Sequence, residues 1–347
     1  MPKTIRNQFD KYLTYEKLLE AHNKSKRGKC RKSELIKFNL KQEEYIMWLY
    51  EQLKEGKYKH GGYATFYVTE PKRRKIEKSR YIDRIVHTWL VENFLIKGFV
   101  TQFIYDSYAC IKNKGMHRAT FAVQKAMRKA KNKWGEYYIL KTDVAKYFNS
   151  IDKEILLKIL ERKIKDKKLI WLIKEILYAQ KRPKGIEIGN YTSQIFANIY
   201  LNEIDQFIKH ELKIKYYVRY LDDSVFILET KDEAKKVLEE VTKFLDEKLK
   251  LKLNDKTQIF KRKQGVNFCE YKINEYRLKI RDRGKRKLKK KVKSLKEKIK
   301  SGKIDCHEAK KYLAGHIGYV KWANVYNLTN KLFYMENNYN VESMKEL

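Results

Sequence analysis

Three aspartates in this sequence combine the residue type and the setting of a metal site. Asp143 ends the apolar stretch EYYILKTDV, and Asp222 and Asp223 lie in YYVRYLDDSVFIL, where two apolar runs flank the pair as in a tight β-hairpin. Carboxylates are the hard oxygen ligands that Mg²⁺ prefers. Two such ions about 4 Å apart activate a hydroxyl and stabilise a phosphate under attack. The three aspartates therefore have the residue type that two-metal nucleotidyl transfer requires.

Each of these features is common when it occurs alone. Adjacent aspartates at a hairpin tip are frequent turn formers, because aspartate tolerates turn geometry. An aspartate at the end of a strand is equally ordinary. The order, spacing and flanking residues of the motifs must therefore decide between a turn and a catalytic site.

The overall charge points to a polyanionic partner. The 347 residues contain 80 Lys and Arg against 43 Asp and Glu, a formal net charge of +37. Nucleic acid is the favoured partner, although a solvated basic surface or a membrane surface would have a similar composition. Because 43% of the residues are hydrophobic, the chain can bury a core and is not a disordered basic tail.

Other compositional features narrow the class of protein. No apolar run approaches the ~20 residues of a membrane helix, and the N-terminus lacks the apolar stretch of a signal peptide. The cysteines are far apart, at Cys30, Cys110, Cys269 and Cys306. We therefore expect a cytoplasmic protein with reduced cysteines, no membrane association and no zinc site.

The hydrophobic patterns predict a continuous α+β body with a helical end. Helical spacing is found over about residues 14–55, 81–103, 118–132, 192–212 and 232–248, with further helices up to about residue 179. Strands are expected at 63–70, 136–144, 257–260 and 266–273, besides the hairpin at 216–228. A very basic amphipathic helix is expected at 285–300, and a last helical region ends near residue 333.

Four motifs, in order, resemble those of reverse transcriptases. TDVAKYFNSID resembles palm motif A, YVRYLDDSVFI the YxDD motif C, LKLNDKTQIF motif D, and GVNFCEYKI the primer-grip hairpin. The resemblance covers about residues 60–330 and implies an α+β right-hand polymerase. Its expected parts are an N-terminal helical extension (1–60), fingers with the start of the palm (61–140), a palm (141–275, with fingers helices at about 153–190) and a basic helical thumb (276–347).

Further segments resemble particular branches of that family. RKIEKSRYIDRIVH is similar to the fingers of intron-type enzymes. DSYACIKNKGMH and GNYTSQIFANIYLN resemble enzymes of diversity-generating retroelements and related domesticated or phage-defence enzymes. These likenesses imply a cognate noncoding RNA and, for a retroelement enzyme, a small basic accessory protein.

The resemblance also implies which residues touch metal and sugar. Asp143, Asp222 and Asp223, with the carbonyl of Val144, would hold two Mg²⁺ ions, for which Mn²⁺ can substitute. Phe148 would lie beneath the sugar and exclude a 2′-hydroxyl. The alternative for Phe148 is a core aromatic, because Tyr147 is adjacent and one of the two must face inward.

A second group would hold the incoming nucleotide. Arg74 and Arg84 match fingers arginines that grip the triphosphate, although Arg74 also lies in a generally basic segment. Ile188, Gly189 and Gln194 would line the nascent base pair. Because Ile188 replaces a glutamine of intron enzymes, we expect weaker base selection unless this side chain simply packs.

The remaining candidates concern proton transfer and the nucleic acid. Lys256 would protonate the leaving pyrophosphate, or contact phosphate, or be merely exposed. Contacts to template RNA, primer and cDNA are expected from the exposed side of the basic helix and from the hairpin: Tyr220, Lys285, Arg286, Lys289 and Lys293.

Three functions are compatible with these motifs. The first is a polymerase that copies RNA into cDNA in a retroelement or in phage defence. The second is a catalytically idle RNA-binding scaffold, which the intact aspartates disfavour. The third is a template-independent nucleotidyltransferase, which only an assay with and without RNA can separate from the first.

Overall fold

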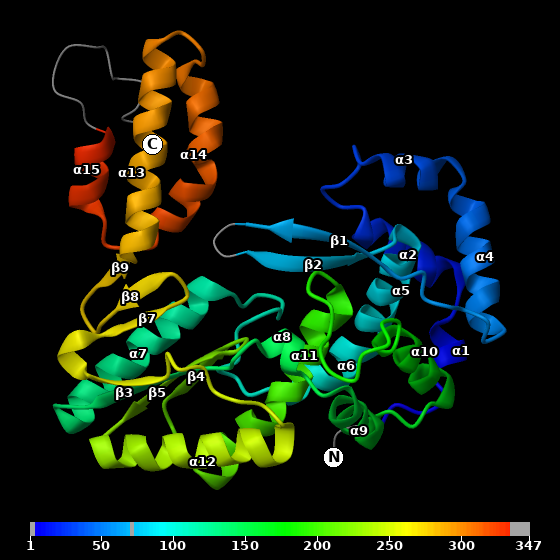
Figure 1. The fold of residues 1–347 in the computed structure, drawn as a ribbon, viewed down its shortest axis with the longest axis horizontal. Helices are drawn as coiled ribbons and strands as arrows, with labels where there is room; N and C mark the ends of the chain where they lie inside the picture. The colour runs from blue at the N-terminus through cyan, green and yellow to red at the C-terminus, as the bar shows by residue number, and fades with distance from the viewer. Residues whose placement is uncertain (1–3, 70–72, 334–347) are drawn as a thin grey trace. The chain divides into compact units, whose positions relative to one another are not determined.

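The fold is described from a computed structural model, which describes residues 4–69 and 73–333. The chain divides into two compact units, each assembled from three separate stretches. The first unit contains residues 1–113, 143–215 and 237–256, and the second contains 114–142, 216–236 and 257–347. Figure 1 labels their helices and strands.

The first unit begins with four helices: α1 (Phe9–Tyr12), α2 (Tyr15–Ser25), α3 (Ser33–Leu40) and α4 (Gln42–Lys54). The hydroxyl of Thr14 caps α2 by accepting the backbone N–H of Lys17. Helix α2 packs against α5 (Tyr81–Leu90), where the Tyr81 hydroxyl lies 3.0 Å from Nδ1 of the buried His22. These helices confirm the expected helical region near the N-terminus.

An antiparallel hairpin follows, made of β1 (Tyr63–Val68) and β2 (Arg74–Ser79), with Tyr63 opposite Ser79. The expectation of a strand at 63–70 is confirmed for β1, and Glu70 lies outside the described residues. Strand β2 was not expected.

The rest of the first unit is helical. After α5 come a π-helical turn (Val91–Leu95), α6 (Ile96–Phe99) and a 3₁₀ turn (Val100–Gln102). Further along the chain are α8 (Tyr147–Ser150), α9 (Lys153–Lys163), α10 (Lys167–Leu177), α11 (Tyr191–Gln206) and a π-helical turn (Phe207–Glu211). Helix α12 (Lys231–Leu249) begins in the second unit and continues into the first.

A four-stranded sheet with the order β4-β5-β3-β6 is the centre of the second unit. Its strands are β3 (Tyr138–Asp143), β4 (Tyr217–Tyr220), β5 (Asp223–Leu228) and β6 (Gln258–Lys261). Asp143, the last residue of β3, is grouped with the first unit. Helix α7 (Met116–Trp134) packs on β4 and β5 through an apolar face that includes Val123 and Met127.

The second unit also contains a three-stranded sheet and the C-terminal helices. The sheet consists of β7 (Val266–Phe268), β8 (Tyr271–Ile273) and β9 (Leu278–Ile280), and a 3₁₀ turn (Arg262–Gln264) precedes it. The helices are α13 (Asp282–Lys300), α14 (Cys306–Val320) and α15 (Tyr326–Phe333). Their core is formed by Leu288, Val292, Leu295, Ala309 and Leu313.

The expectations about the cysteines and about membrane helices can be compared with the structure. The four cysteines carry free thiols. Within the described ranges, no helix has the length and apolar character needed to cross a membrane.

Candidate active site

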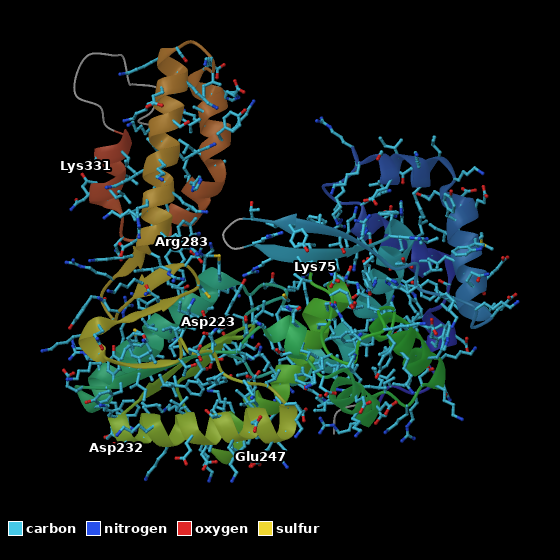
Figure 2. All side chains as sticks on the ribbon, in the orientation of Figure 1. Lys75, Asp223, Asp232, Glu247, Arg283 and Lys331 are labelled. Carbon is cyan, nitrogen blue, oxygen red and sulfur yellow. The ribbon has the colours of Figure 1, made fainter. Side chains whose placement is uncertain are left out.

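The turn that carries Asp222 is tight and strained. Tyr220 at the end of β4 pairs with Asp223 at the start of β5, so Leu221 and Asp222 alone form the connection. Leu221 has a φ of 53°, a left-handed conformation that costs a residue with a branched side chain roughly 1–3 kcal/mol. The predicted hairpin is confirmed, and Asp223 (labelled in Figure 2) is the first residue of its second strand.

Lys141 is a neighbour of this turn that the sequence did not single out. Its Nζ lies 3.2 Å from Oδ1 of Asp223, and the two side chains are only 20% and 26% exposed. Side chains two residues apart on a strand share a face. Lys141 could therefore have been suspected from its position two residues before Asp143.

The segment that follows β3 is held by backbone hydrogen bonds. The carbonyl of Asp143 accepts the N–H of Asn254 at 2.7 Å, and Val144, which is buried, forms a β-bridge with Leu253. Lys256 lies beyond this contact with an exposed side chain, and its N–H donates to Oδ1 of Asn254. The backbone of Asp143 and Val144 is thus fixed, whereas the Lys256 ammonium is accessible.

The aspartates have the donor chemistry for a hard divalent cation. Over residues 4–69 and 73–333, no three His, Cys, Asp or Glu side chains are grouped closely enough to hold a metal ion. The carboxylate of Asp223 nevertheless already binds one cation, the ammonium of Lys141. The residues therefore fit a metal by type, and the three-aspartate site itself stays a prediction.

The structure separates the roles of the two aromatic residues after Asp143. Tyr147 is 2% exposed, and its hydroxyl donates to the carbonyl of Ala197 at 2.5 Å. Phe148 is only partly buried, with its ring centroid 5.7 Å from that of Tyr147. Tyr147 is therefore the core aromatic of the two, and the side chain of Phe148 is left accessible for the predicted contact with a sugar.

Three of the predicted nucleotide-binding residues line one pocket of the first unit. Arg84, Gly189 and Gln194 belong to a cavity of about 530 Å³. Gly189 has a φ of 118°, and a Cβ there would lie 3.0 Å from Cγ2 of Ile76, so a side chain at this position would be strained. The pocket also contains residues that the sequence did not single out: Lys24, Ser25, Arg27, Lys29, His87, Thr88, Glu92, Lys112, Asn190 and Tyr191.

The other two nucleotide-binding candidates are not among the residues that line this pocket. Arg74 begins β2 and its side chain is exposed. Ile188 is partly buried, and its carbonyl accepts the N–H of Glu77 at 3.1 Å. Their assignments stay predictions.

Buried polar residues fix the edge of the pocket. Asn190 is 2% exposed; its Oδ1 accepts the hydroxyl of Ser79 at 2.9 Å, and its Nδ2 donates to the carbonyl of Glu77 at 3.0 Å. Arg182 donates to both Glu77 and Glu187, at 2.9 and 3.3 Å. These contacts join the start of α11 to β2, so the loop with Gly189 is held rigidly.

A histidine pair lies beside the same pocket. Nδ1 of His87 is 2.6 Å from Oγ1 of Thr192, and its Nε2 is 3.2 Å from Nε2 of His60. Burial, followed by the charges of His60 and Arg84, lowers the pKa of His87 to about 3. His87 is therefore neutral at physiological pH.

The predicted nucleic-acid contacts fall on two elements. Lys285, Arg286, Lys289 and Lys293 of α13 all have exposed side chains, while Leu288, Val292 and Leu295 of the same helix are buried. The predicted amphipathic helix is thus confirmed, and its cations are available to solvent. Tyr220 is partly buried at the end of β4.

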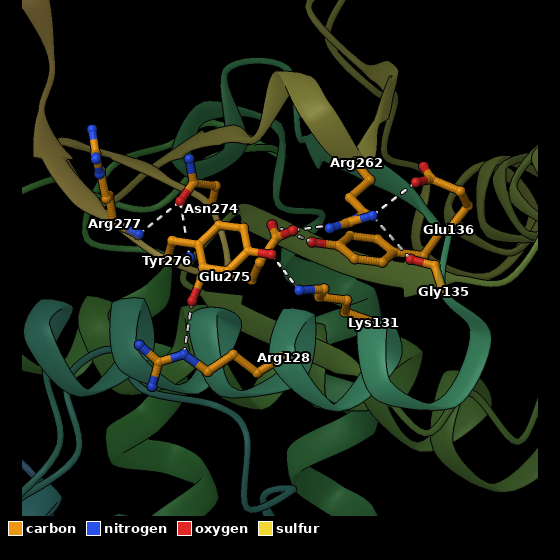
Figure 3. A network of polar contacts seen from close by, with 10 residues as sticks. Arg128, Lys131, Gly135, Glu136, Arg262, Asn274, Glu275, Tyr276 and Arg277 are labelled. Atoms are coloured by element: carbon orange, nitrogen blue, oxygen red, sulfur yellow. Dashed lines mark hydrogen bonds and ion pairs between the residues drawn. The ribbon is translucent and has the colours of Figure 1, made fainter.

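A polar network in the second unit anchors the turn between β8 and β9 (Figure 3). Glu275 is 5% exposed and accepts hydrogen bonds from Arg262 at 2.7 Å and from the Tyr137 hydroxyl at 3.1 Å. Arg128 of α7 donates to the Glu275 carbonyl. Burial alone would raise the pKa of Glu275, but these hydrogen bonds, with a backbone one, lower it.

Comparisons with known proteins agree with the motifs. Residues 70–273 match the family described as reverse transcriptase (RNA-dependent DNA polymerase). Protein YkfC of Escherichia coli (strain K12) is 24% identical over 209 residues, which cover 48% of this chain and 54% of that protein. Group II intron-encoded protein LtrA of Lactococcus lactis subsp. cremoris is 25% identical over 185 residues, which cover 50% of this chain and 30% of that protein.

A putative COX1/OXI3 intron 2 protein of Saccharomyces cerevisiae is 23% identical over 201 residues, 39% of this chain and 24% of that protein. The chain therefore spans 24–54% of the length of these relatives. Similar solved structures include apo telomerase of Candida tropicalis without its C-terminal domain. Its TM-score is 0.48 at 13% identity, and the match covers 63% of this chain and 55% of the telomerase chain. Telomerase of Candida albicans with a fragment of telomeric RNA has a TM-score of 0.48 at 12% identity, and the match covers 69% of this chain and 50% of the telomerase chain.

The family match, residues 70–273, includes β2, the YxDD turn and all of β8, and it covers more than half of the chain. It includes Asp143, Asp222 and Asp223 in the predicted order. The chain therefore belongs to the reverse transcriptase (RNA-dependent DNA polymerase) family, and its fold is the α+β fold of right-hand polymerases.

Proposed function

We propose that this chain is an RNA-directed DNA polymerase that extends a primer along an RNA template into cDNA. The observation that carries the proposal is the strained YLDD turn next to β3. The sheet order places β3, which ends at Asp143, beside β5, which begins at Asp223. The family description, RNA-dependent DNA polymerase, supports an RNA template for this chain as well.

Asp143, Asp222 and Asp223, with the Val144 carbonyl, would hold two divalent ions, Mg²⁺ or Mn²⁺. When bound, these ions lower the pKa of the primer 3′-hydroxyl and stabilise charge on the α-phosphate. Arg84 and Arg74 would bind the triphosphate, since guanidinium forks match phosphate oxygens. Phe148 would contact the sugar, and Ile188, Gly189 and Gln194 the new base pair.

Lys256 would donate a proton to the leaving pyrophosphate. Its exposed ammonium supports access to a leaving group, and the fixed backbone of Asn254 holds its loop. We further propose a cognate noncoding RNA, a small basic accessory protein, and a role in a diversity-generating retroelement or in phage defence. These finer proposals rest on the resemblance of residues 106–117 and 189–202.

Primer extension on an RNA template tests the polymerase proposal. We expect Asp222→Ala to reduce nucleotide incorporation by at least about a hundredfold, the scale on which an essential charged group acts. Asp232→Ala is the matched control, because Asp232 is an exposed aspartate in the first turn of α12 and should leave incorporation unchanged.

Omitting the RNA separates the proposed function from its alternatives. Incorporation that needs no template would identify a template-independent nucleotidyltransferase. A wild-type protein that binds RNA but incorporates nothing, or an Asp222→Ala variant with full activity, would contradict the proposal.

A further inference from the structure

The segment between α2 and α3 is strongly basic and lies against α5. Residues 26–32 read KRGKCRK, with five cations in seven positions. The segment starts where Ser25 ends α2, and the Ser25 hydroxyl lies 2.8 Å from that of Thr88 and donates to the carbonyl of Arg84 at 3.4 Å. The end of α2 is therefore hydrogen-bonded to α5, and the basic segment begins next to the helix that contains Arg84.

Two of these cations, Arg27 and Lys29, line the pocket that contains Arg84, together with further cations from outside the segment. Lys24, Arg27 and Lys29 come from α2 and the loop after it, and Lys112 comes from a separate loop. Lys24 is neutralised by Glu92, whose carboxylate is 2.6 Å away. The other cations leave the pocket with an excess of positive charge, which favours an anionic ligand.

Glu34 of α3 is the carboxylate next to this cluster. A single oxygen, Oε1, accepts hydrogen bonds from Lys78 at 2.6 Å and from Arg84 at 2.7 Å. Burial lowers the pKa of the Lys29 ammonium, and the nearby positive charges lower it further: Arg84, Lys32 and Lys78. The negative charge of Glu34 acts in the opposite direction and offsets part of this shift. Three cations, Lys29, Lys78 and Arg84, thus interact with the Glu34 carboxylate, and one of its oxygens is bound by two of them as a phosphate oxygen would be.

We propose that Lys29, Arg84 and the other pocket cations form a subsite for the triphosphate of the incoming nucleotide, with Lys29 as an affinity-determining residue. Glu34 is the internal counter-ion that the triphosphate displaces. The inference rests on the proposed polymerase function and assigns to the N-terminal helices a part in nucleotide binding.

The form of the pocket favours a triphosphate over the phosphates of a template strand. A cavity of about 530 Å³ suits a compact ligand, and its cations converge on one place instead of following an extended track. Gly189 and Gln194, the proposed neighbours of the new base pair, line the same cavity. The base and the triphosphate of one nucleotide would therefore both find their contacts there.

Charge-neutralising variants test the subsite. Lys29→Gln should raise the KM for the nucleotide two- to fivefold, about the effect of a part-exposed ion pair. Glu34→Gln should lower the KM by a similar factor, because Lys78 and Arg84 are released to the triphosphate. Lys17→Gln and Glu20→Gln are matched controls, since these residues form an exposed ion pair on α2, 2.9 Å apart, and should leave the KM unchanged.

Binding measurements separate this idea from its alternatives. With a chain-terminated primer, the next nucleotide should stabilise the complex with template–primer less in Lys29→Gln than in the wild type. Weaker template–primer binding with an unchanged KM would assign the cluster to the template strand and overturn the proposal. A raised KM in Glu34→Gln would overturn the counter-ion role and make Glu34 a positioning residue for Arg84.

The variant Arg84→Ala distinguishes a failure of the proposed Lys29 subsite from a failure of the proposed polymerase function. If Arg84→Ala raises the nucleotide KM while Lys29→Gln does not, the proposed function stands and the added subsite is wrong. If neither variant changes the KM of an active enzyme, the proposed grip of Arg84 on the triphosphate fails with it.

Discussion

The ion pair between Lys141 and Asp223 places a positive charge beside one of the three aspartates. Neither side chain is more than about a quarter exposed, so the pair is poorly screened by water. Packed carboxylates repel one another, and a nearby ammonium relieves part of that repulsion. Lys141 therefore compensates part of the charge of Asp223.

We expect Lys141→Met to make the protein less stable without metal and more responsive to it. Removal of the ammonium should cost about 1 kcal/mol of unfolding free energy, the upper range for a part-exposed pair. Added Mn²⁺ should then raise the Tm more in the variant than in the wild type. Thermal unfolding with and without Mn²⁺ measures both effects.

Lys272→Met removes an exposed lysine from β8 of the same unit and provides the control for net charge. A Lys141→Met variant whose Tm rises with Mn²⁺ no more than that of this control would show that Lys141 does not compete for the Asp223 carboxylate.

At the scale of elements, local patterns predicted most of the structure and failed where local signals are weak. The YLDD hairpin and α13 were predictable because apolar residues recur with strand and helix periods. Strand β2 was not, because RKIEKS has one apolar residue, Ile76, and is recognised as a strand only through its pairing with β1.

Residues 266–273 show a second kind of failure. They were expected as one strand but form a hairpin, β7 and β8, whose turn consists of Cys269 and Glu270. Both turn residues have positive φ, at 46° and 67°, a role usually taken by Asn and Gly. Nothing in the residue types marks this turn, although the family resemblance does imply a hairpin.

Helix α13 leads to a prediction about salt. Removing one lysine that binds a phosphate should reduce the slope of log affinity against log salt by about 0.7–0.9. We therefore expect the double variant Lys289→Gln, Lys293→Gln to bind template–primer with a slope smaller by about 1.5. Filter binding over a salt series measures it.

The control removes two exposed lysines from α12, Lys236→Gln and Lys243→Gln, with the same change in net charge. Equal slopes for the two double variants would mean that affinity follows net charge alone, and that α13 makes no phosphate contacts of its own.

At the scale of the whole molecule, the division into two units could not be predicted from composition. The boundaries fall inside β3 and inside α12 as well as in loops, so no Pro- or Gly-rich linker marks them. The pocket was equally hidden. Resemblance suggested Arg84, Gly189 and Gln194, but Lys29 lines the pocket only because α2 packs on α5, and Glu34 reaches it only through its contact with Arg84.

The buried histidines predict how stability responds to acid. The folded-state pKa is about 4 for His22 and about 3 for His87, against a usual value of 6.5, with burial as the first cause in both. Between these values the unfolded chain binds more protons than the folded one, so stability is fully present above pH 6.5 and falls as the pH drops.

We expect the Tm to be constant from pH 8 to 7 and to fall from pH 6.5 to 5, a window above the usual titration range of carboxylates. His87→Asn should flatten this fall, because the residue can no longer be protonated in the unfolded chain. A pH profile of the variant parallel to that of the wild type would show that His87 is not responsible.

The order of strands β4-β5-β3-β6 has a consequence for synthesis on the ribosome. Strand β3 ends at Asp143, but its neighbour β6 begins only at Gln258. At roughly 5–20 residues per second, the nascent chain carries an unpaired, apolar β3 for several seconds before either neighbour has emerged. During that interval β3 is an exposed, aggregation-prone strand edge, so chaperones that cover such edges should increase the yield of active protein.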